Sequence, residues 1–219
     1  MSGRTIVMTD VHGCSREFVQ LLEMVSVDYT DDTFVFLGDA IDRGPDDWGV
    51  MEQLTQLRWL MEERFIWIMG NHEQRLLDRH PKKKKMPPYD RHDILYFLPL
   101  LRELPYYAET ENCIFVHAGY SMNPKKNTKQ FMLEDRSILK GQRRYSGKLY
   151  IAGHSPIPNV SYVDPYGNIT RVESGMELPE HGAIFLDTGC CAGGKLSALV
   201  IEDHIIKLYQ VLSKQFTKL

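Results

Sequence analysis

The sequence predicts an α/β fold, in which short strands alternate with helices. Short β-branched and apolar runs recur along the first two thirds of the chain, and each stops at a turn containing Gly, Asp, Asn or His. Segments with apolar residues at helical spacing follow several of these turns. With 219 residues, 43% of them hydrophobic and 25% charged, the chain can bury a core without disulfides. We therefore predict a single domain that spans residues 1–219.

The strands expected in the first part of the chain share one construction. Their residues are mostly β-branched, aromatic or otherwise apolar, which suits a pleated and buried surface. Each strand ends at a turn that carries polar side chains. These strands are predicted at residues 5–9, 33–37, 65–69, 113–116 and 149–152.

Helices are expected to connect these strands. Ser15 is predicted to cap the first helix, and Pro45 suits the first position of the second. The four lysines at 82–85 lie in a stretch rich in Pro and Lys, which indicates a solvated loop or, alternatively, a rim that attracts polyphosphate. The helices are predicted at residues 15–25, 45–63, 73–79 and 93–101.

The second half of the chain changes character. Residues 120–148 are polar and basic, with an apolar piece only near 131–139, and we expect a partly helical excursion over the site. Hairpin turns are expected at 164–167 and 202–203. The remaining strands are predicted at residues 160–163, 169–172, 183–186, 196–201 and 205–211.

Composition argues against several classes of partner. A net charge of −3 gives no reason to expect a nucleic acid polymer or an anionic membrane. The first apolar run is broken at Asp10 and is too short for a signal-peptide core or a membrane span. The four cysteines lack C-x-x-C spacing, so we expect reduced thiols and a cytoplasmic protein of undetermined oligomeric state.

The turn at residues 38–44 reads Gly-Asp-Ala-Ile-Asp-Arg-Gly and brings two carboxylates and a guanidinium together. These are the side chains of Asp39, Asp42 and Arg43. A Gly-Asp pair alone is an ordinary turn former. Because the same construction recurs at five strand ends, where α/β sheets place their chemistry, we interpret it as a functional site.

Six residues in these turns are of types that bind metals through carboxylate, amide or imidazole groups. They are Asp10, His12, Asp39, Asn71, His117 and His154. This mixed set of hard and borderline ligands suits Mn, Fe or Zn better than Ca. Six ligands suffice for two metals that share a carboxylate and remain open to water. We expect two divalent ions, with Mn²⁺ preferred and Fe or Zn as alternatives.

The motifs resemble those of the phosphoprotein phosphatase family, within the calcineurin-like metallophosphoesterases. The bacterial, phage and diadenosine-tetraphosphatase branches are the most similar in size, and the resemblance extends from residue 5 to about 201. It implies a central β-sandwich of two mixed sheets with helices on the outer faces. The matching motifs are Asp10-x-His12-Gly13, Gly38-Asp39-x-x-Asp42-Arg43-Gly44, Gly70-Asn71-His72-Glu73, His117-Ala118-Gly119 and Gly153-His154.

Two departures accompany the resemblance. Thr9 precedes Asp10 where many members have Gly. The backbone of this turn is therefore expected to approach the site slightly differently. The loop at 188–194 follows the small-residue bacterial pattern and lacks the aromatic loop of eukaryotic protein phosphatases. Toxin binding and regulatory subunits known from the eukaryotic enzymes are therefore not expected to carry over.

The resemblance also assigns the ligands to two metals that share Asp39. The first metal would be held by Asp10, His12 and Asp39. The second would be held by Asp39, Asn71, His117 and His154. Two such metals stabilise an in-line displacement at phosphorus.

Catalytic and substrate-binding roles follow from the same resemblance. His72 would protonate the leaving group, and Asp42 would orient its imidazolium. Arg43 has a planar fork that suits phosphate oxygens, and Asn71 is assigned to substrate binding as well as to the metal. Arg136 is the best match to a second phosphate-binding arginine, although a surface salt bridge explains it equally well.

The function expected from this pattern is hydrolysis of phosphoserine or phosphothreonine in proteins, as in a serine/threonine protein phosphatase. One alternative is cleavage of dinucleoside polyphosphates such as diadenosine tetraphosphate. The other is a catalytically silent phosphate-binding module, although such a module has no need of a leaving-group acid. The expected partner is thus a phosphorylated protein or peptide, or a nucleotide polyphosphate.

Overall fold

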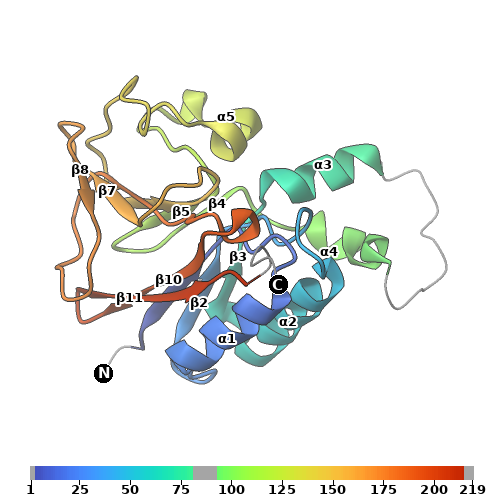
Figure 1. Ribbon diagram of the computed structural model, residues 1–219. Coiled ribbons are helices and arrows are strands. Elements are labelled where there is room, and N and C mark those ends of the chain that lie inside the picture. Colours follow the sequence, from blue (N-terminus) through green and yellow to red (C-terminus); the bar gives the residue numbers. More distant parts are fainter. Residues whose placement is uncertain (1–2, 81–92, 215–219) are drawn as a thin grey trace.

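The computed structural model describes residues 3–80 and 93–214, and within them two mixed β-sheets pack face to face (Figure 1). In the first sheet the strand order is β11-β10-β1-β2-β3. β1, β2 and β3 run parallel, whereas β10 is antiparallel to β1 and β11 is antiparallel to β10. The strands of this sheet are β1 (Thr5–Met8), β2 (Thr33–Phe36), β3 (Phe65–Trp67), β10 (Lys195–Glu202) and β11 (Ile205–Leu212).

The second sheet is also mixed, with the order β4-β5-β6-β9-β7-β8. β5, β6 and β9 form a parallel centre, and antiparallel pairs complete both edges. Its strands are β4 (Tyr107–Glu109), β5 (Ile114–Val116), β6 (Tyr150–Ala152), β7 (Ser161–Val163), β8 (Ile169–Arg171) and β9 (Ala183–Phe185). This architecture confirms the predicted β-sandwich, and the β7–β8 and β10–β11 hairpins confirm the two predicted turns.

Helices flank the two sheets. Figure 1 shows α1 and α2 against the outer face of the first sheet, α3 at one end of the sandwich, and α5 beside the second sheet. No helix among the described residues is long and apolar enough to cross a membrane. The α-helices are α1 (Ser15–Val25), α2 (Asp47–Met61), α3 (Asn71–Arg79), α4 (Leu98–Leu101) and α5 (Lys129–Glu134). Short 3-10 helices are η1 (Glu62–Arg64), η2 (Ile94–Phe97), η3 (Pro124–Lys126) and η4 (Cys190–Ala192).

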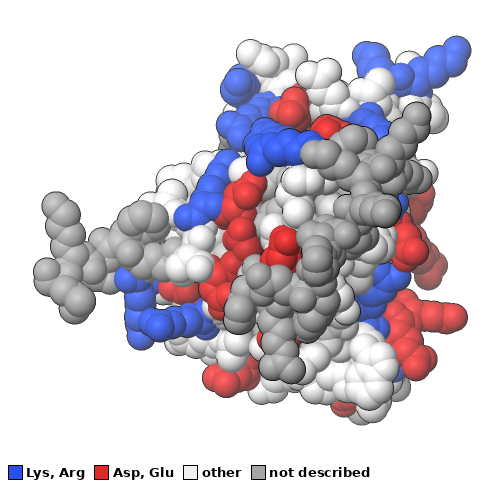
Figure 2. Space-filling model, turned by 90° about the vertical axis from the view of Figure 1, so that its right-hand side faces the viewer, with Lys and Arg blue, Asp and Glu red and all other residues white. Residues whose placement is uncertain are grey.

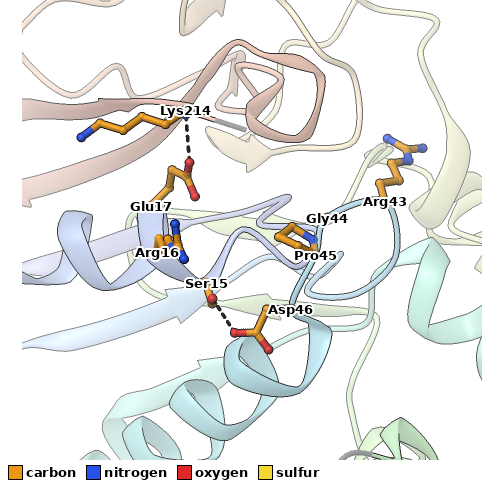
Figure 3. Close-up of a pocket in the computed structure, with 8 residues that line it drawn as sticks. All are labelled: Ser15, Arg16, Glu17, Arg43, Gly44, Pro45, Asp46 and Lys214. Carbon is orange, nitrogen blue, oxygen red and sulfur yellow. Dashed lines mark hydrogen bonds between the residues drawn. The ribbon is translucent and has the colours of Figure 1, made fainter. Parts of the chain in front are cut away.

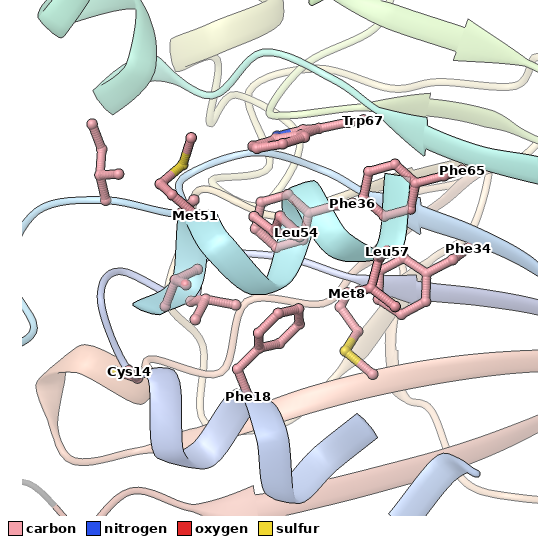
Figure 4. Close-up of a cluster of buried hydrophobic side chains, with 14 of the residues drawn as sticks. Met8, Cys14, Phe18, Phe34, Phe36, Met51, Leu54, Leu57, Phe65 and Trp67 are labelled. Carbon is pink, nitrogen blue, oxygen red and sulfur yellow. The ribbon is translucent and has the colours of Figure 1, made fainter. Parts of the chain in front are cut away.

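Strand alternation divides the core into layers. Because successive side chains point to opposite faces, Val7 of β1 lies between the sheets, whereas Ile6 and Met8 face the helices. Figure 4 shows the helix-side layer, in which Phe18 of α1 and Leu54 of α2 pack against the aromatic side chains of β2 and β3. Both faces of these strands are thus buried, which explains their nearly continuous apolar sequences.

The start of α1 differs from the prediction that Ser15 caps it. Cys14 occupies the N-cap position and makes no side-chain cap bond. The Ser15 hydroxyl instead donates to Asp46 Oδ2 at 2.6 Å, while Asp46 Oδ1 accepts the N–H of Gly49 at 2.8 Å. Asp46 therefore caps α2, Pro45 lies outside that helix, and Ser15 joins the two helix starts.

Other differences concern the segment that follows α3. The predicted helix at 93–101 is a 3-10 turn followed by a four-residue α-helix, and Pro99, which has no N–H to donate, lies at the start of α4. β4 is absent from the prediction because its three residues form a short edge strand with two exposed side chains. The excursion at 120–148 is partly helical as predicted. The lysines at 82–85 lie outside the described residues.

Candidate metal centre and active site

The five motif turns meet at one end of the sandwich. Asp10 follows β1, Asp39 follows β2, and Asn71 starts α3 directly after β3. His117 follows β5 and His154 follows β6, so the second sheet contributes as well. The carboxyl ends of parallel strands lie at the same edge of a sheet, and here two such edges face each other. All five side chains are buried.

The backbone of these turns is strained. Among the described residues, ten non-glycine residues have positive φ, and six of them belong to the motifs. An L-residue rarely adopts this conformation, and such outliers cluster at functional sites. The six are Asp10, His12, Asp39, Asp42, Arg43 and His154.

Close packing of the turns also explains two motif glycines. Gly38 has φ 90°, and a Cβ added there would collide with the backbone of Gly70. A Cβ on Gly70 would in turn collide with the Asp39 backbone. The turns after β2 and β3 therefore touch only because both positions lack side chains.

The first group of ligand atoms comes from the turns after β1 and β2. His12 Nε2 lies 3.5 Å from Asp39 Oδ2 and 3.8 Å from Asp10 Oδ1. His12 Nδ1 lies 2.9 Å from the carbonyl oxygen of Ile41, so this nitrogen donates and Nε2 presents a lone pair to the carboxylates. Asp10 Oδ2 accepts the Thr9 hydroxyl at 2.6 Å and the His154 N–H at 2.9 Å, which leaves Oδ1 for the centre.

The second group surrounds Asn71. Its Oδ1 lies 2.9 Å from His117 Nε2 and 2.9 Å from His154 Nδ1, while His117 Nε2 is also 3.4 Å from Asp39 Oδ2. His117 Nδ1 is 2.8 Å from the carbonyl oxygen of Leu37, which orients the ring with Nε2 inward. Two triplets of side chains have ligand atoms within 4.8 Å of one another, namely the buried His12–Asp39–His72 and the largely buried Asp39–His117–His154.

These donor atoms fit divalent metals. Metal–nitrogen and metal–oxygen bonds of about 2.0–2.2 Å place neighbouring ligand atoms about 2.9–3.5 Å apart, and most of the measured separations fall in that range. The Asn71 amide gives a second test, because it has two orientations. With the NH₂ group inward, it would donate to Asp39 Oδ2 at 3.0 Å and its oxygen would accept from Arg75. With Oδ1 inward, it presents the atom through which amides bind metals.

Burial and mutual charge set the pKa values in the protein without metal. Burial lowers the pKa of His12 to about 4 and that of His154 to about 3, so both imidazoles are neutral at pH 7. Burial opposes protonation of His117, but the Asp39 carboxylate outweighs it and raises the pKa of His117 to about 10. Burial likewise disfavours the ionised form of Asp39. The neighbouring His117 nevertheless holds the pKa of this carboxyl below its usual range. A metal that binds here must displace the proton of His117.

His72 and Asp42 form a pair beside these ligands. His72 Nδ1 lies 2.6 Å from Asp42 Oδ2, and the His72 backbone N–H donates to Asp39 Oδ1 at 2.9 Å. The His72 ring packs edge-on against His12, with 4.7 Å between ring centroids. The remaining ring nitrogen, Nε2, is thus directed away from Asp42.

The two predicted arginines reach the site from different sides. Arg43 is exposed, and its Nη1 lies 3.9 Å from Cys191 Sγ in the small-residue loop. Arg136 is also exposed, and its Nη2 donates to the carbonyl oxygen of His154 at 3.2 Å. Among the described residues Arg136 makes no ion pair, so the salt-bridge interpretation gains no support.

A pocket of about 620 Å³ lies on the outer side of the Arg43 turn. Arg43, Ser15, Asp46 and Lys214 are among its lining residues (Figure 3). None of the six candidate metal ligands lines it, and the Arg43 guanidinium points away from the Ser15–Asp46 hydrogen bond (Figure 3). This pocket therefore adjoins the candidate site through Arg43 and Gly44 of the second motif.

The prediction gave no role to three residues near the site. Glu73 is fully buried and accepts the N–H groups of Asp39 and Ala40 at 2.8 Å and of Gly70 at 3.1 Å. Burial and the Asp39 charge raise the pKa of Glu73 to about 7. Asp187 follows β9 directly, and burial raises its pKa to about 6. The third, Arg75, is described below.

A signal for two of these residues was available in the sequence. Asp187 lies at a strand end like the other motif residues, and Glu73 stands in the third motif. The contacts of Arg75 depend on the direction of α3 and leave no such signal.

The fold and this arrangement define a metallophosphoesterase. Residues 3–194 match the family described as calcineurin-like phosphoesterase, and the chain belongs to that family. Its members are metal-dependent phosphoesterases, and the buried His and Asp groups supply candidate ligands here.

Among curated proteins, the chain is similar to one type of phosphoesterase. The chain is 29% identical over 169 residues to the symmetrical bis(5'-nucleosyl)-tetraphosphatase of Coxiella burnetii, covering 69% of this chain and 54% of that protein. It is 25% identical over 161 residues to the enzyme of the same name from Nitrosomonas europaea, covering 69% and 58%. The chain thus spans little more than half the length of these relatives.

Solved structures support the fold. A crystal structure described as a candidate diadenosine tetraphosphatase superposes with a TM-score of 0.65 at 22% identity, covering 98% of this chain and 96% of that one. A serine/threonine protein phosphatase from Saccharomyces cerevisiae has a TM-score of 0.65 at 14% identity, covering 95% and 79%. At these identities the likeness shows the shared fold alone.

The prediction of a serine/threonine protein phosphatase is wrong. The curated relatives named above are symmetrical tetraphosphatases, and no phosphoprotein substrate is supported. A structure of each type shares this fold, so the fold and the motifs alone do not identify the leaving group. The alternative, dinucleoside polyphosphate cleavage, is the better interpretation.

Proposed function

We propose that this protein hydrolyses dinucleoside tetraphosphates, cleaving the phosphate chain symmetrically into two nucleoside diphosphates. The observation that carries the substrate class is the similarity to symmetrical bis(5'-nucleosyl)-tetraphosphatases over 69% of the chain. The convergent ligand set supports the reaction type, because metal-assisted phosphoryl hydrolysis needs such a centre.

In this proposal the two motif groups hold two divalent ions, preferably Mn²⁺, with Asp39 shared between them. When bound, the ions supply a Lewis acid for the phosphate and lower the pKa of water so that it attacks at neutral pH. Asp10 and His12 complete one group, and Asn71, His117 and His154 complete the other. The Nδ1 contacts of His12 and His117 with backbone carbonyl oxygens preorganise both imidazoles.

The remaining residues act on the substrate. Arg43 binds oxygens of the scissile phosphate through its fork, and Arg136 adds a second cation beside the His154 turn. His72 Nε2 delivers a proton to the leaving oxygen. Asp42, 2.6 Å from His72 Nδ1, accepts the Nδ1–H bond and stabilises the imidazolium. Asn71 contributes its amide to substrate binding as well as to the metal.

A product assay tests this proposal. The manganese-loaded protein is incubated with diadenosine tetraphosphate, and nucleotides are separated by anion-exchange chromatography. ADP as the only nucleotide product supports symmetrical cleavage, whereas AMP with ATP would show asymmetrical cleavage. Turnover of a phosphopeptide under the same conditions serves as the comparison. A phosphopeptide turned over faster than the tetraphosphate would refute the proposal.

A further inference from the structure

Arg75 lies on the face of α3 that carries the site. It follows Asn71 by four residues and His72 by three, so the three side chains share one side of the helix. Helical side chains lean toward the N-terminus of their helix, and the start of α3 is the metal-binding end. The Arg75 guanidinium therefore reaches back over Asn71 and His72 rather than out along the helix.

The contacts of Arg75 show how closely it borders the leaving-group acid. Arg75 Nη1 lies 3.3 Å from His72 Nε2, the nitrogen assigned above to the leaving group. Its Nη2 lies 3.9 Å from Glu134 Oε1 of α5, and both side chains are nearly half exposed, at 46% and 45%. An ion pair this long and exposed is weak, so it leaves the charge of Arg75 available to a ligand.

The Asn71 amide links Arg75 to the metal centre. With its NH₂ group inward, the amide oxygen lies 2.9–3.1 Å from the two Nη atoms of Arg75 and accepts from them. When Oδ1 turns inward to bind a metal, the NH₂ group faces Arg75, and donors then face donors. With Oδ1 inward, the NH₂ group of Asn71 and the guanidinium of Arg75 would both present N–H groups, and an anion beside them would accept from both.

Part of the charge on this side of the site is basic. Figure 2 shows basic side chains gathered on the upper part of the face bordered by α3, at the height of α5, with acidic side chains beside them. Arg43 Nη1 lies 3.9 Å from Cys191 Sγ, and Arg136 Nη2 donates to the carbonyl oxygen of His154 at 3.2 Å. Of these three arginines, Arg75 alone contacts His72 Nε2.

We propose that Arg75 is a specificity-determining residue, which binds the phosphate of the departing nucleotide in a polyphosphate substrate. This inference rests on the proposed function and adds the residue that recognises the leaving nucleotide. A serine or alkyl leaving group is neutral and offers Arg75 nothing to bind. A nucleoside diphosphate carries anionic oxygens beside the scissile bond, and a guanidinium fork binds them bidentately.

Binding of products tests the inference separately from turnover. Calorimetric titration of the manganese-loaded protein with ADP and with inorganic phosphate compares a leaving nucleotide with the bare phosphoryl product. Arg75→Gln should weaken ADP binding about tenfold or more, since hydrogen bonds between charged groups are among the strongest. Phosphate binding should change several-fold less, and Arg75→Lys should recover part of the ADP affinity. Arg79→Gln, one turn further along α3, is the matched control and should behave as wild type.

Kinetics provide the second measurement. For diadenosine tetraphosphate, Arg75→Gln should raise KM or lower kcat/KM about tenfold or more, with a several-fold smaller loss on p-nitrophenyl phosphate. Equal losses for both ligands and both substrates, or no loss, would overturn the assignment of Arg75. If wild type does not cleave the tetraphosphate, the proposed function fails, while the ADP titrations still decide whether Arg75 binds a nucleotide phosphate.

Discussion

At the scale of single residues, Asp39 is the point at which the two ligand groups meet. Its Oδ2 lies 3.5 Å from His12 Nε2 and 3.4 Å from His117 Nε2, so one oxygen faces an imidazole of each group. Its Oδ1 is occupied by the His72 backbone N–H at 2.9 Å. The carboxylate therefore positions the start of α3 with one oxygen and presents the other to both ligand groups.

Replacing this carboxylate should remove both metals rather than one. Asp39→Asn should lose activity and metal together, because an amide lacks the charge and the second oxygen that a bridging ligand needs. Elemental analysis after manganese loading and desalting should find about two ions in wild type and fewer than one in the variant. Asp31→Asn, in an exposed turn, is the control. An Asp39→Asn protein that keeps two ions would contradict the bridging role.

The role of His72 depends on the leaving group and can be separated from metal binding. His72→Asn should slow hydrolysis of an alkyl phosphate by roughly 10²–10⁴-fold, since loss of a positioned proton donor has that cost. The effect on p-nitrophenyl phosphate should be much smaller, because its leaving group scarcely needs a proton. Rates on both substrates, with metal content measured in parallel, check this expectation. Equal losses would instead indicate that His72 positions other groups.

At the scale of secondary-structure elements, hydrogen bonds of Glu73 connect α3 to the turn after β2. Its carboxylate accepts three backbone N–H groups in a fully buried position. Glu73→Gln would set an NH₂ group against some of these donors and should lower the free energy of unfolding by about 2–4 kcal/mol. Urea denaturation of metal-free protein measures the loss, with the exposed Glu52→Gln as control. An unchanged unfolding midpoint would show that the three hydrogen bonds contribute little.

The contact between the turns after β2 and β3 gives a second prediction at this scale. Gly38 and Gly175 have similar φ values of 90° and 93°, but only at Gly38 would an added Cβ meet neighbouring backbone. Gly175→Ala should therefore cost only the conformational strain, about 1–3 kcal/mol. Gly38→Ala should cost at least about 2 kcal/mol more, from displaced backbone. Denaturant midpoints compare the two, and equal losses would mean that the turns can separate freely.

The sequence reveals most of this architecture because each motif turn directly follows a strand. Position along the chain thus suffices to bring Asp10, Asp39 and Asn71 to one edge. Contacts that depend on the orientation of a helix cannot be predicted from position along the chain. Arg75 reaches His72 only because α3 points away from the site, and Ser15 bonds to Asp46 only because α1 and α2 begin side by side.

At the scale of the whole molecule, the substrate was the part that the motifs could not decide. Enzymes with different leaving groups share this fold, so the error lay in inferring the whole substrate from the motif turns. We expect discrimination to come from side chains further out, such as the proposed Arg75.

The candidate metal centre also joins the two sheets. Asp10, Asp39 and Asn71 follow strands of the first sheet, whereas His117 and His154 follow strands of the second. Direct contacts already cross this junction, among them His154 N–H to Asp10 at 2.9 Å and His117 Nδ1 to the Leu37 carbonyl oxygen at 2.8 Å. Metals bound between the sheets would add to these contacts in the folded state only.

Removing metal should therefore destabilise the whole sandwich. Binding to the folded state alone adds about 2.7 kcal/mol at one hundred times Kd and about 4.1 kcal/mol at one thousand times. For a chain of this size, chelation should lower Tm by roughly 5–15 °C, and manganese should restore it. Calorimetry of His117→Ala should show most of this shift lost, whereas His181→Ala, at an exposed position outside the motifs, should retain it. If chelation leaves the Tm of wild type unchanged, the two sheets are held together without the metals.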